Sequence, residues 1–499
     1  MNLFPGKFAF SVGHYTLRVK RYAFSVRRFA LGLKKALRLA LYALSLMLFL
    51  KSESKGQCCI PDNPALRKLV ETKELSTALV GVYVYDDSSK KEIADYLGDK
   101  YFVPASNTKL FSLYVGLKYL GDSLVGIRYS ENDTAIFVYP TGDPSLLHPD
   151  FQSQPVIDFL RKTHKKIYLM DVGWMENALG VGWAWDDYNE DFAIERSAFP
   201  IYGNFIRWNQ QNSSTRSNPA FGPTVTVSSS PEIPWKVRFS TDSFPKTFFV
   251  QRLMDSNVFI IRSGNEPNIS QDVPFITNNM NAAAELLPDT IGKPVSVHKL
   301  PLFRVDVNKI GQPIISLPPP PDSINSRPAD SVFIPMMHRS DNFFAEQTLL
   351  MVSQQRIRWM NDELVIKSLL DTIMNGPLAD LPQKPSWVDG SGLSRFNLFS
   401  PRDFVSVLIK LKNEVGMDRM KKILPTGGSG TLKNYYRADS GYVFVKTGSL
   451  TGVLCLSGYV YTYKKHLLEF SILINNHNGG SSAIRRAVEA YVEYLRKSN

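Results

Sequence analysis

The stretch FVPASNTKLF, residues 102–111, places a serine and a lysine three positions apart at the start of an apolar run. On a helix, positions i and i+3 share a face, so the ammonium group of Lys109 would lie close to the hydroxyl of Ser106. A helix start also offers free backbone N–H groups, which suit a developing oxyanion. The S-x-x-K pattern recurs at 52–55 and 88–91. By itself it does not separate a nucleophile and its base from an ordinary capped helix.

A lysine acts as a general base only when burial or a neighbouring cation lowers its pKa. The segment YVFVKTGSLTG supplies such a cation, because an apolar strand runs into Lys446, Thr447, Gly448 and Ser449. A lysine and two hydroxyls on one strand edge favour binding of a carboxylate. The glycine lets a substrate backbone approach closely and pair along that edge.

The segment MHRSDNFFAEQ supplies a third element. Ser340 and Asn342 stand two apart just before an apolar helical run, so a loop can turn both side chains toward one cleft. S-x-N is weak alone, since 130–132 and 323–325 also match it. S-x-x-K, then S-x-N, then K-T-G is nevertheless the signature of penicillin-recognising serine acyltransferases.

The chain resembles one branch of these enzymes closely: the D-alanyl-D-alanine carboxypeptidase/endopeptidase family of low-molecular-mass, class C penicillin-binding proteins. A long insertion of well over 200 residues separates Lys109 from Ser340. VDGSGLSRFN (388–397) is similar to the glycine-serine loop of that family, and LPTGGSGTLKN (424–434) to the segment before its KTG strand. The resemblance covers about residues 65–495.

The resemblance implies a set of catalytic roles. Ser106 attacks the carbonyl of the penultimate D-alanine, and Lys109 takes its proton. Ser340 relays a proton to the leaving amine, while Asn342 holds the amide of the substrate. Lys446 supplies the second positive charge that lowers the pKa of Lys109. No metal ion or organic cofactor is implied, because Ser–Lys chemistry is complete in itself.

The resemblance also implies substrate contacts. Thr447 and Ser449 grip the terminal carboxylate, with Gly448 between them. A free amine and a carboxylate at the end of the diamino acid of the peptide would pair with Asp171 and Arg395 respectively. Asp171 is equally well explained as an ordinary strand-end carboxylate, and the insertion is where the resemblance is weakest. The resemblance implies a pocket that binds the side chain of this diamino acid, lined by Leu393, Arg395, Leu450 and Asp171.

The patterning of the whole chain predicts a multidomain α+β protein. A strand at 77–86 and the helix after it come first, and the strands and closing helix of 442–497 come last. We expect both ends of the chain to form one antiparallel sheet with helices on it, a transpeptidase domain of the penicillin-binding-protein/β-lactamase type. A large β-rich insertion interrupts it and ends at the proline tract 315–331. The predicted boundaries are 57–120 and 321–499 for the two parts of this domain, and 121–320 for the insertion.

The N-terminal segment, residues 1–56, has the layout of an export signal. It carries ten of the twelve net positive charges, so the rest of the chain is nearly neutral and nucleic acid is not an expected partner. The apolar stretch 39–50 is short for a membrane span. Small residues at Ser54 and Gly56 fit cleavage before Gln57. The segment predicts a periplasmic or envelope-associated protein, and a retained anchor with loose membrane association stays open.

The three cysteines and seven histidines show no metal or disulfide pattern. Cys58 and Cys59 stand at the expected mature terminus, and Cys455 lies in a strand-like run, where it is interpreted as a small buried hydrophobe. HExxH is absent.

Peptidoglycan stem peptides are therefore the implied substrates, and β-lactam antibiotics the implied covalent inhibitors. A β-lactamase is the first alternative, but no E-x-x-L-N motif stands between the second and third elements and the insertion is long. A transpeptidase and a catalytically idle wall-binding protein are the others. Ser391 and Ser429 also lie in glycine-rich loops, but neither sits in a G-x-S-x-G elbow. Ser391 is interpreted as a loop-shaping residue.

Overall fold

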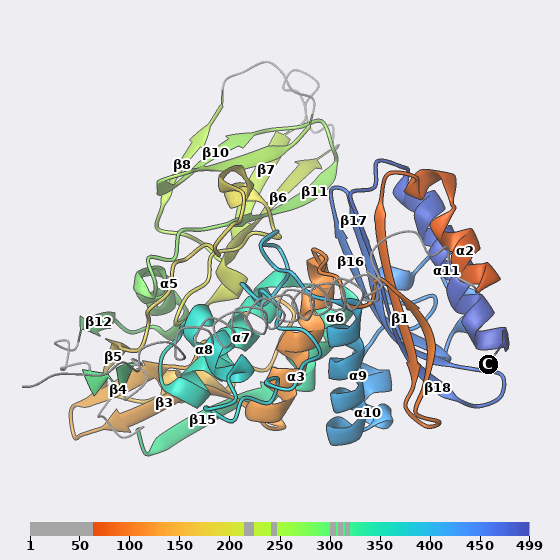
Figure 1. Ribbon diagram of the computed structural model, residues 1–499. Helices are drawn as coiled ribbons and strands as arrows, with labels where there is room; N and C mark the ends of the chain where they lie inside the picture. Colours follow the sequence, from red (N-terminus) through yellow and green to blue (C-terminus); the bar gives the residue numbers. More distant parts are fainter. Residues whose placement is uncertain are drawn as a thin grey trace, which may run out of the picture. The chain divides into compact units, whose positions relative to one another are not determined.

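The two ends of the chain form one antiparallel sheet in the computed structural model, which describes residues 63–213, 224–240, 247–299, 306–307, 313–314 and 320–498. The strand order is β16-β17-β18-β1-β2 (Figure 1). β17 and β18 are buried along almost their whole length, which explains why their sequences are continuous apolar runs rather than alternating ones. The strands are β1 (Leu79–Asp86), β2 (Lys91–Tyr96), β16 (Val443–Leu450), β17 (Val453–Tyr461) and β18 (Leu467–Asn475).

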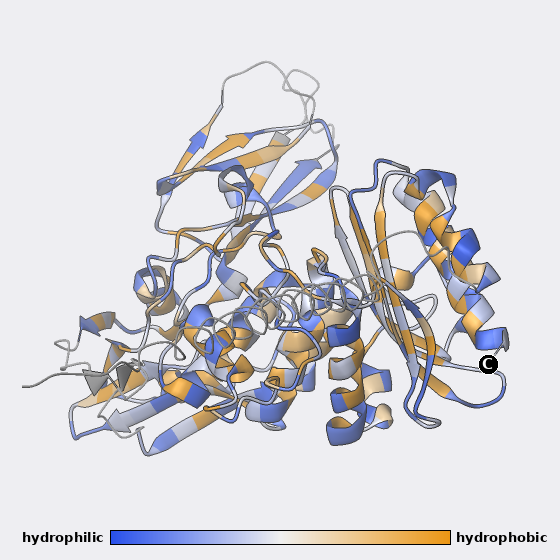
Figure 2. Ribbon diagram, viewed as in Figure 1, coloured by the Kyte–Doolittle hydropathy of each residue, from blue (hydrophilic) through white to orange (hydrophobic). Residues whose placement is uncertain are grey.

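Helices cover both faces of this sheet. On one face, α11 (Ser481–Ser498) packs on β17 and on α2 (Pro64–Val70). On the other face, α9 (Pro401–Val415) packs on β18 and β1 (Figure 1). The hydrophobic residues of α11 form the side that is buried on the sheet, and its other side is hydrophilic (Figure 2). The buried residues of α11 include the four that the sequence placed on one helical face: Ile484, Val488, Tyr491 and Leu495.

The helix after Ser106 lies in the core. It begins as the 3-10 helix η2 (Ala105–Thr108) and continues as α3 (Lys109–Tyr119), which packs against α7 (Asn342–Ile357). The first eight residues of α3 are all buried, in agreement with the predicted buried helix. The other helices of this region are α6 (Asp330–His338), α8 (Asp362–Leu370) and α10 (Met417–Ile423).

The insertion between α3 and α6 begins and ends in a second five-stranded sheet of order β12-β5-β4-β3-β15. β4, β5 and β12 are parallel neighbours, and α4 (Pro155–Lys162) and α5 (Asn281–Ile291) pack against each other beside this sheet. Parallel strands need such crossover helices, so this part is α/β rather than purely β-rich. Its strands are β3 (Ser123–Glu131), β4 (Ala135–Pro140), β5 (Lys166–Asp171), β12 (Val295–Lys299) and β15 (Asp322–Pro328).

Two three-stranded sheets complete the β-rich part of the insertion. Their orders are β11-β6-β7 and β8-β10-β9. The bounds are β6 (Phe205–Ser213), β7 (Thr224–Ser230), β8 (Lys236–Phe239), β9 (Phe249–Leu253), β10 (Ser256–Arg262) and β11 (Asn268–Pro274), with a short ladder of β13 (Asp306–Val307) and β14 (Pro313–Ile314). Short 3-10 helices elsewhere are η1 (Lys73–Leu75), η3 (Trp185–Asn189), η4 (Tyr202–Asn204), η5 (Gly430–Leu432) and η6 (Arg437–Asp439).

The end of the insertion differs from the sequence-based boundary at residue 320. β15 lies within the proline tract 315–331, yet it pairs with β3 and so belongs to the sheet of the insertion. It is an edge strand, a position in which a proline such as Pro328 is tolerated. The chain therefore returns to the transpeptidase domain at about Ala329.

The predicted export signal, the cleavage position predicted before Gln57, Cys58 and Cys59 lie outside the described residues. Among the residues that are described, none of the helices has the length and apolar character needed to cross a membrane.

Candidate active site

The S-x-x-K pair lies where η2 passes into α3. Ser106 belongs to the 3-10 turn and Lys109 is the first residue of the α-helix. The Lys109 side chain is fully buried, and its Nζ lies 3.0 Å from Ser106 Oγ. The backbone of this turn fixes that separation, because the two residues are one turn apart. The structure thus brings the predicted nucleophile and base into contact.

Two further oxygens receive hydrogen bonds from Lys109. Its Nζ donates to Asn342 Oδ1 at 2.6 Å and to the carbonyl oxygen of Ser391 at 2.8 Å. Burial lowers the pKa of Lys109 to about 8. A lysine with this pKa is neutral in a useful fraction of molecules near neutral pH, as a general base requires. The carboxylates that oppose the effect of burial are those of Asp389, Glu346 and Asp341.

The second lysine lies against the S-x-N motif. Ser340 occupies the left-handed turn between α6 and α7, with φ of 63°. The fully buried Lys446 donates to Ser340 Oγ at 2.9 Å and to the carbonyl oxygen of Thr447 at 2.7 Å. Burial and the charge of Lys109 hold the pKa of Lys446 well below its usual value. For Lys109 the cause of the lowered pKa is burial, so the predicted tuning of Lys109 by the charge of Lys446 stays a prediction.

The KTG strand passes close to the turn that carries the nucleophile. A Cβ atom at Gly448 would lie 2.6 Å from the carbonyl oxygen of Pro104 and 3.1 Å from the backbone nitrogen of Asn107. Asn107 Nδ2 also donates to Ser457 Oγ on β17 at 2.7 Å. η2 therefore packs on the face of the sheet that the Cβ of residue 448 would enter, over β16 and its neighbour β17. A larger residue than glycine would push the strand away from the nucleophile.

The two hydroxyls that follow Lys446 have partners of their own. The hydroxyl of Thr447 lies 2.9 Å from that of Thr431 in η5. Ser449 is exposed, and its Oγ accepts a hydrogen bond from Arg485 Nη2 at 2.9 Å. Thr431 lies in the segment 424–434 that the resemblance marked, although no role was assigned to it. Arg485 carries no motif, and the sequence did not indicate it.

The loop 388–397 closes over the nucleophile turn. The carboxylate of Asp389 accepts hydrogen bonds from two backbone N–H groups of the loop at 2.7 Å. Gly392 adopts φ of +83°, and a Cβ atom there would lie 1.9 Å from the carbonyl oxygen of Ala105. The loop is therefore fitted to the residue that directly precedes Ser106.

The other two serines of the glycine-rich loops hold local turns. Ser391 Oγ accepts the N–H of Leu393 at 3.2 Å, and Ser429 Oγ donates to the carbonyl oxygen of Thr426 at 2.8 Å. Neither hydroxyl is hydrogen-bonded to Lys109, whose contact with Ser391 is through the main chain. This agrees with the interpretation of Ser391 as a loop-shaping residue.

A model of the D-Ala-D-Ala carboxypeptidase 3 (S13) family matches residues 63–497 of the chain. The protein belongs to this family. It is accordingly an enzyme of the serine-type D-Ala-D-Ala carboxypeptidase class, as the resemblance predicted. Similar curated proteins include the D-alanyl-D-alanine carboxypeptidase DacB of Haemophilus influenzae, 24% identical over 80% of this chain and 86% of that protein. A D-alanyl-D-alanine carboxypeptidase of an Actinomadura species is 22% identical over 82% of this chain and 80% of that protein.

The solved structures confirm the fold class. The crystal structure of penicillin binding protein 4 (dacB) from Haemophilus influenzae has a TM-score of 0.64 at 22% identity, covering 84% of this chain and 96% of that one. The same protein complexed with a β-lactam has a TM-score of 0.61 at 21% identity, covering 87% of this chain and 98% of that one.

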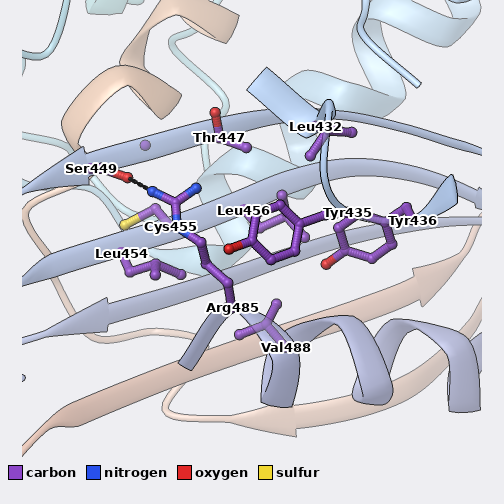
Figure 3. A pocket seen from close by; sticks show the side chains of 11 residues that line it. Leu432, Tyr435, Tyr436, Thr447, Ser449, Leu454, Cys455, Leu456, Arg485 and Val488 are labelled. Atoms are coloured by element: carbon purple, nitrogen blue, oxygen red, sulfur yellow. Dashed lines mark hydrogen bonds between the residues drawn. The ribbon is translucent and has the colours of Figure 1, made fainter. Parts of the chain in front are cut away.

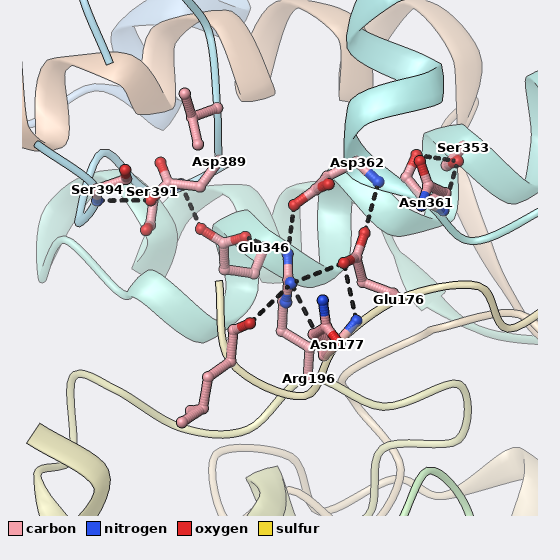
Figure 4. Close-up of polar contacts among 12 residues, drawn as sticks. Glu176, Asn177, Arg196, Glu346, Ser353, Asn361, Asp362, Asp389, Ser391 and Ser394 are labelled. Carbon is pink, nitrogen blue, oxygen red and sulfur yellow. Dashed lines mark hydrogen bonds and ion pairs between the residues drawn. The ribbon is translucent and has the colours of Figure 1, made fainter. Parts of the chain in front are cut away.

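A buried charge network next to the active site of this carboxypeptidase was not predicted. Glu346 Oε1 accepts the backbone N–H of Ser391 at 2.7 Å, and Glu346 Oε2 lies 3.5 Å from the buried guanidinium of Arg196 (Figure 4). Arg196 belongs to the insertion and also pairs with Glu176 at 3.1 Å and Asp362 at 2.7 Å. Burial raises the pKa of Glu346 and of Glu176 to about 7. The network thus links the insertion, through Ser391, to Lys109.

The insertion also reaches the S-x-N motif. The carbonyl oxygen of Phe192 accepts a hydrogen bond from Asn342 Nδ2 at 2.9 Å. An asparagine amide carries two N–H bonds, so the second remains for a further acceptor. Spacing could have pointed to Glu346, because it stands four residues after Asn342 on the same helix and so shares its face. No comparable signal marks Phe192.

The residues predicted to line the side-chain pocket lie in two places. The loop residue Arg395 donates from Nη2 to the carbonyl oxygen of Thr451 at 2.7 Å, which brings loop 388–397 to the end of β16 beside Leu450. Asp171 ends β5 of the insertion, and its Oδ1 accepts a hydrogen bond from Asn279 at 2.9 Å. Within the described part of the chain, no hydrogen bond or ion pair joins Asp171 to Arg395. A pocket shared by Asp171, Leu393, Arg395 and Leu450 stays a prediction.

Proposed function

We propose that the protein is an exported, penicillin-sensitive enzyme that removes the terminal D-alanine of peptidoglycan stem peptides and also cleaves D-Ala-linked cross-links. The observation that carries this proposal is the contact between Ser106 and the fully buried Lys109, whose pKa is lowered to about 8. A serine hydroxyl is a weak nucleophile until an adjacent base removes its proton. Lys109 is within reach and has a suitable proton affinity.

The proposed reaction has two covalent steps. Ser106 Oγ bonds to the carbonyl carbon of the penultimate D-alanine as its proton passes to Lys109. The C–N bond then breaks, the leaving amine takes a proton relayed by Ser340, and an ester remains on Ser106. Water next attacks this ester as Lys109 takes its proton; the bond from the acyl carbon to Ser106 Oγ breaks, and the proton passes from Lys109 to Ser106 Oγ as the shortened peptide leaves. The proton balance closes over the cycle without a cofactor.

Substrate binding is assigned to the groups around the two lysines. The free N–H of Asn342 is available for the carbonyl oxygen of the substrate amide. The hydroxyls of Thr447 and Ser449 take the terminal carboxylate, on the strand whose Gly448 packs closely against η2. Lys446 supplies a hydrogen bond to Ser340.

Digestion of defined muropeptides tests this proposal. Purified protein is incubated with an uncross-linked pentapeptide and with a D-Ala-linked dimer, and the products are identified by mass. We expect loss of one D-alanine from the first substrate and two monomers from the second, with the Ser106→Ala variant inactive on both. Conversion of neither substrate would contradict the proposed function. Conversion of the pentapeptide alone would remove the endopeptidase part.

Export and penicillin sensitivity have their own tests. N-terminal sequencing of protein from its native host is expected to begin near Gln57, whereas residues upstream of 39 would show a retained anchor. The Haemophilus influenzae relative was solved with a bound β-lactam. For this protein we expect a fluorescent penicillin to form a stable covalent adduct; rapid turnover of the same compound would instead indicate a β-lactamase.

A further inference from the structure

A small pocket lies behind the KTG strand, between the sheet and the start of α11. Its walls include Thr447 and Ser449 of β16, Leu454 and Leu456 of β17, and Arg485 and Val488 of α11. Figure 3 shows the aliphatic part of Arg485 running across the pocket, so that the guanidinium group reaches the end of β16. Val488, one turn further along α11, is buried. The apolar side of α11 therefore anchors a charged group beside the predicted carboxylate site.

The polar contacts of Arg485 leave its charge unneutralised. Nη2 donates to Ser449 Oγ at 2.9 Å, and the guanidinium lies 5.8 Å from the ring centroid of Tyr435. Throughout the described ranges, no carboxylate lies within ion-pair distance of Arg485, whereas its neighbour Arg486 pairs with Glu489. A guanidinium has five N–H donors, so most of its capacity remains for a ligand.

Lys446 and Arg485, the two cationic side chains near the KTG motif, lie on opposite faces of the sheet at β16. Successive side chains of a strand point to opposite faces, so Thr447 and Ser449 share one face and Lys446 takes the other. Lys446 is fully buried and already donates to Ser340 and to the main chain. The half-buried Arg485 lies on the face of the two hydroxyls and contacts one of them.

We propose that Arg485 is the ionic partner of the terminal carboxylate of the substrate, which binds across Ser449 and the guanidinium. This inference rests on the proposed D-Ala-D-Ala substrate. Arginine binds carboxylates through two parallel charge-assisted hydrogen bonds, which neutral hydroxyls do not provide. The contact would select peptides with a free C-terminus over those whose terminal carboxylate is blocked.

The test compares an acyl-D-Ala-D-Ala peptide with the same peptide carrying a C-terminal amide. Hydrolysis is measured for the wild type and the variants Arg485→Ala, Arg485→Lys and Arg486→Ala. Losing one charged hydrogen-bond partner is expected to lower kcat/KM for the free acid by about 10- to 100-fold in Arg485→Ala. The amide should be hydrolysed at the wild-type rate by the same variant, and Arg485→Lys should recover part of the preference for the acid. Arg486→Ala, the matched control, should behave as wild type on both peptides.

Binding separates this proposal from the proposed function. In a Ser106→Ala background, titration calorimetry with both peptides gives affinities without turnover. Tighter binding of the acid that weakens by 10-fold or more with Arg485→Ala supports the proposal. An undiminished preference for the acid in Arg485→Ala, or an equal loss on both peptides, overturns it and leaves the substrate class standing. A wild-type enzyme that neither binds nor cleaves either peptide overturns the substrate class, and the assignment of Arg485 with it.

Discussion

Replacing Glu346 by glutamine tests whether the buried charge network sets the proton affinity of Lys109. Glu346 accepts the N–H of Ser391 at 2.7 Å, and the carbonyl oxygen of Ser391 accepts from Lys109 Nζ at 2.8 Å. Glutamine keeps the size of the side chain and an oxygen for the Ser391 N–H. It removes one negative charge that favours the protonated form of Lys109.

The expected effect follows from the separation of the two groups. The main chain of Ser391 bridges the two groups through two hydrogen bonds. Unit charges about 8 Å apart in an effective dielectric of about 20 interact by about 2 kcal/mol, or about 1.5 pKa units. Glu346 is one of the carboxylates whose charge favours the protonated form of Lys109. Arg196 neutralises part of this charge. We therefore expect the pKa of Lys109 to fall by about 0.5 to 1.5 in the Glu346→Gln variant.

The assay is the second-order rate of acylation by a fluorescent penicillin across a range of pH. Acylation requires neutral Lys109, so the rising limb of the profile should move to lower pH in Glu346→Gln. Asp362→Asn is the matched control, because Asp362 contacts the same Arg196 but is not among the groups that act on Lys109. A limb that stays in place or moves to higher pH in Glu346→Gln would refute the reasoning. An equal displacement in Asp362→Asn would show a general effect of disturbing the network.

Three further outcomes are expected. Gly392→Ala should lower the free energy of unfolding by at least about 1 kcal/mol in thermal melting and slow acylation, because its Cβ would meet the Ala105 carbonyl; wild-type values of both would contradict this. Lys446→Ala should slow acylation, because Ser340 loses a hydrogen-bond donor; if a second cation also tunes Lys109, the pH profile should move upward, and an unmoved profile would leave only a binding role. Asp171→Asn and Arg395→Ala should each weaken the preference for peptides with a free diaminopimelate-type terminus, and an unaltered preference would place that pocket elsewhere.

The fold of the transpeptidase domain was predictable because its elements carry strong local patterns. The apolar runs that became β1, β17 and β18 and the amphipathic α11 needed no knowledge of their partners. The insertion was predicted less well. α5 contains Pro288, which weakens any helical signal, and β15 lies in a proline tract whose pairing with β3 depends on residues about 200 positions away.

The residues of the candidate site also fall into two groups: those that a sequence motif marks and those that only the folded structure reveals. Motif spacing predicted Ser106, Lys109 and the S-x-N and KTG residues, and the structure brings the two lysines to the predicted serines; their catalytic roles stay predictions. Arg196 and Arg485 carry no motif, and only folding brings them to Glu346 and Ser449. A buried arginine in the insertion is indistinguishable in sequence from a surface arginine. The three-dimensional contacts are what mark both residues.

The claim on which everything else depends is that Ser106 is the nucleophile, and mapping of a covalent penicillin label tests it most directly. Wild-type protein and the Ser106→Ala variant are treated with a fluorescent penicillin, digested and analysed by peptide mass. The account predicts one labelled peptide containing Ser106 in the wild type and no label in the variant, with both proteins folded by thermal melting. Label that persists in Ser106→Ala, and that maps to Ser391 or Ser429, would contradict it.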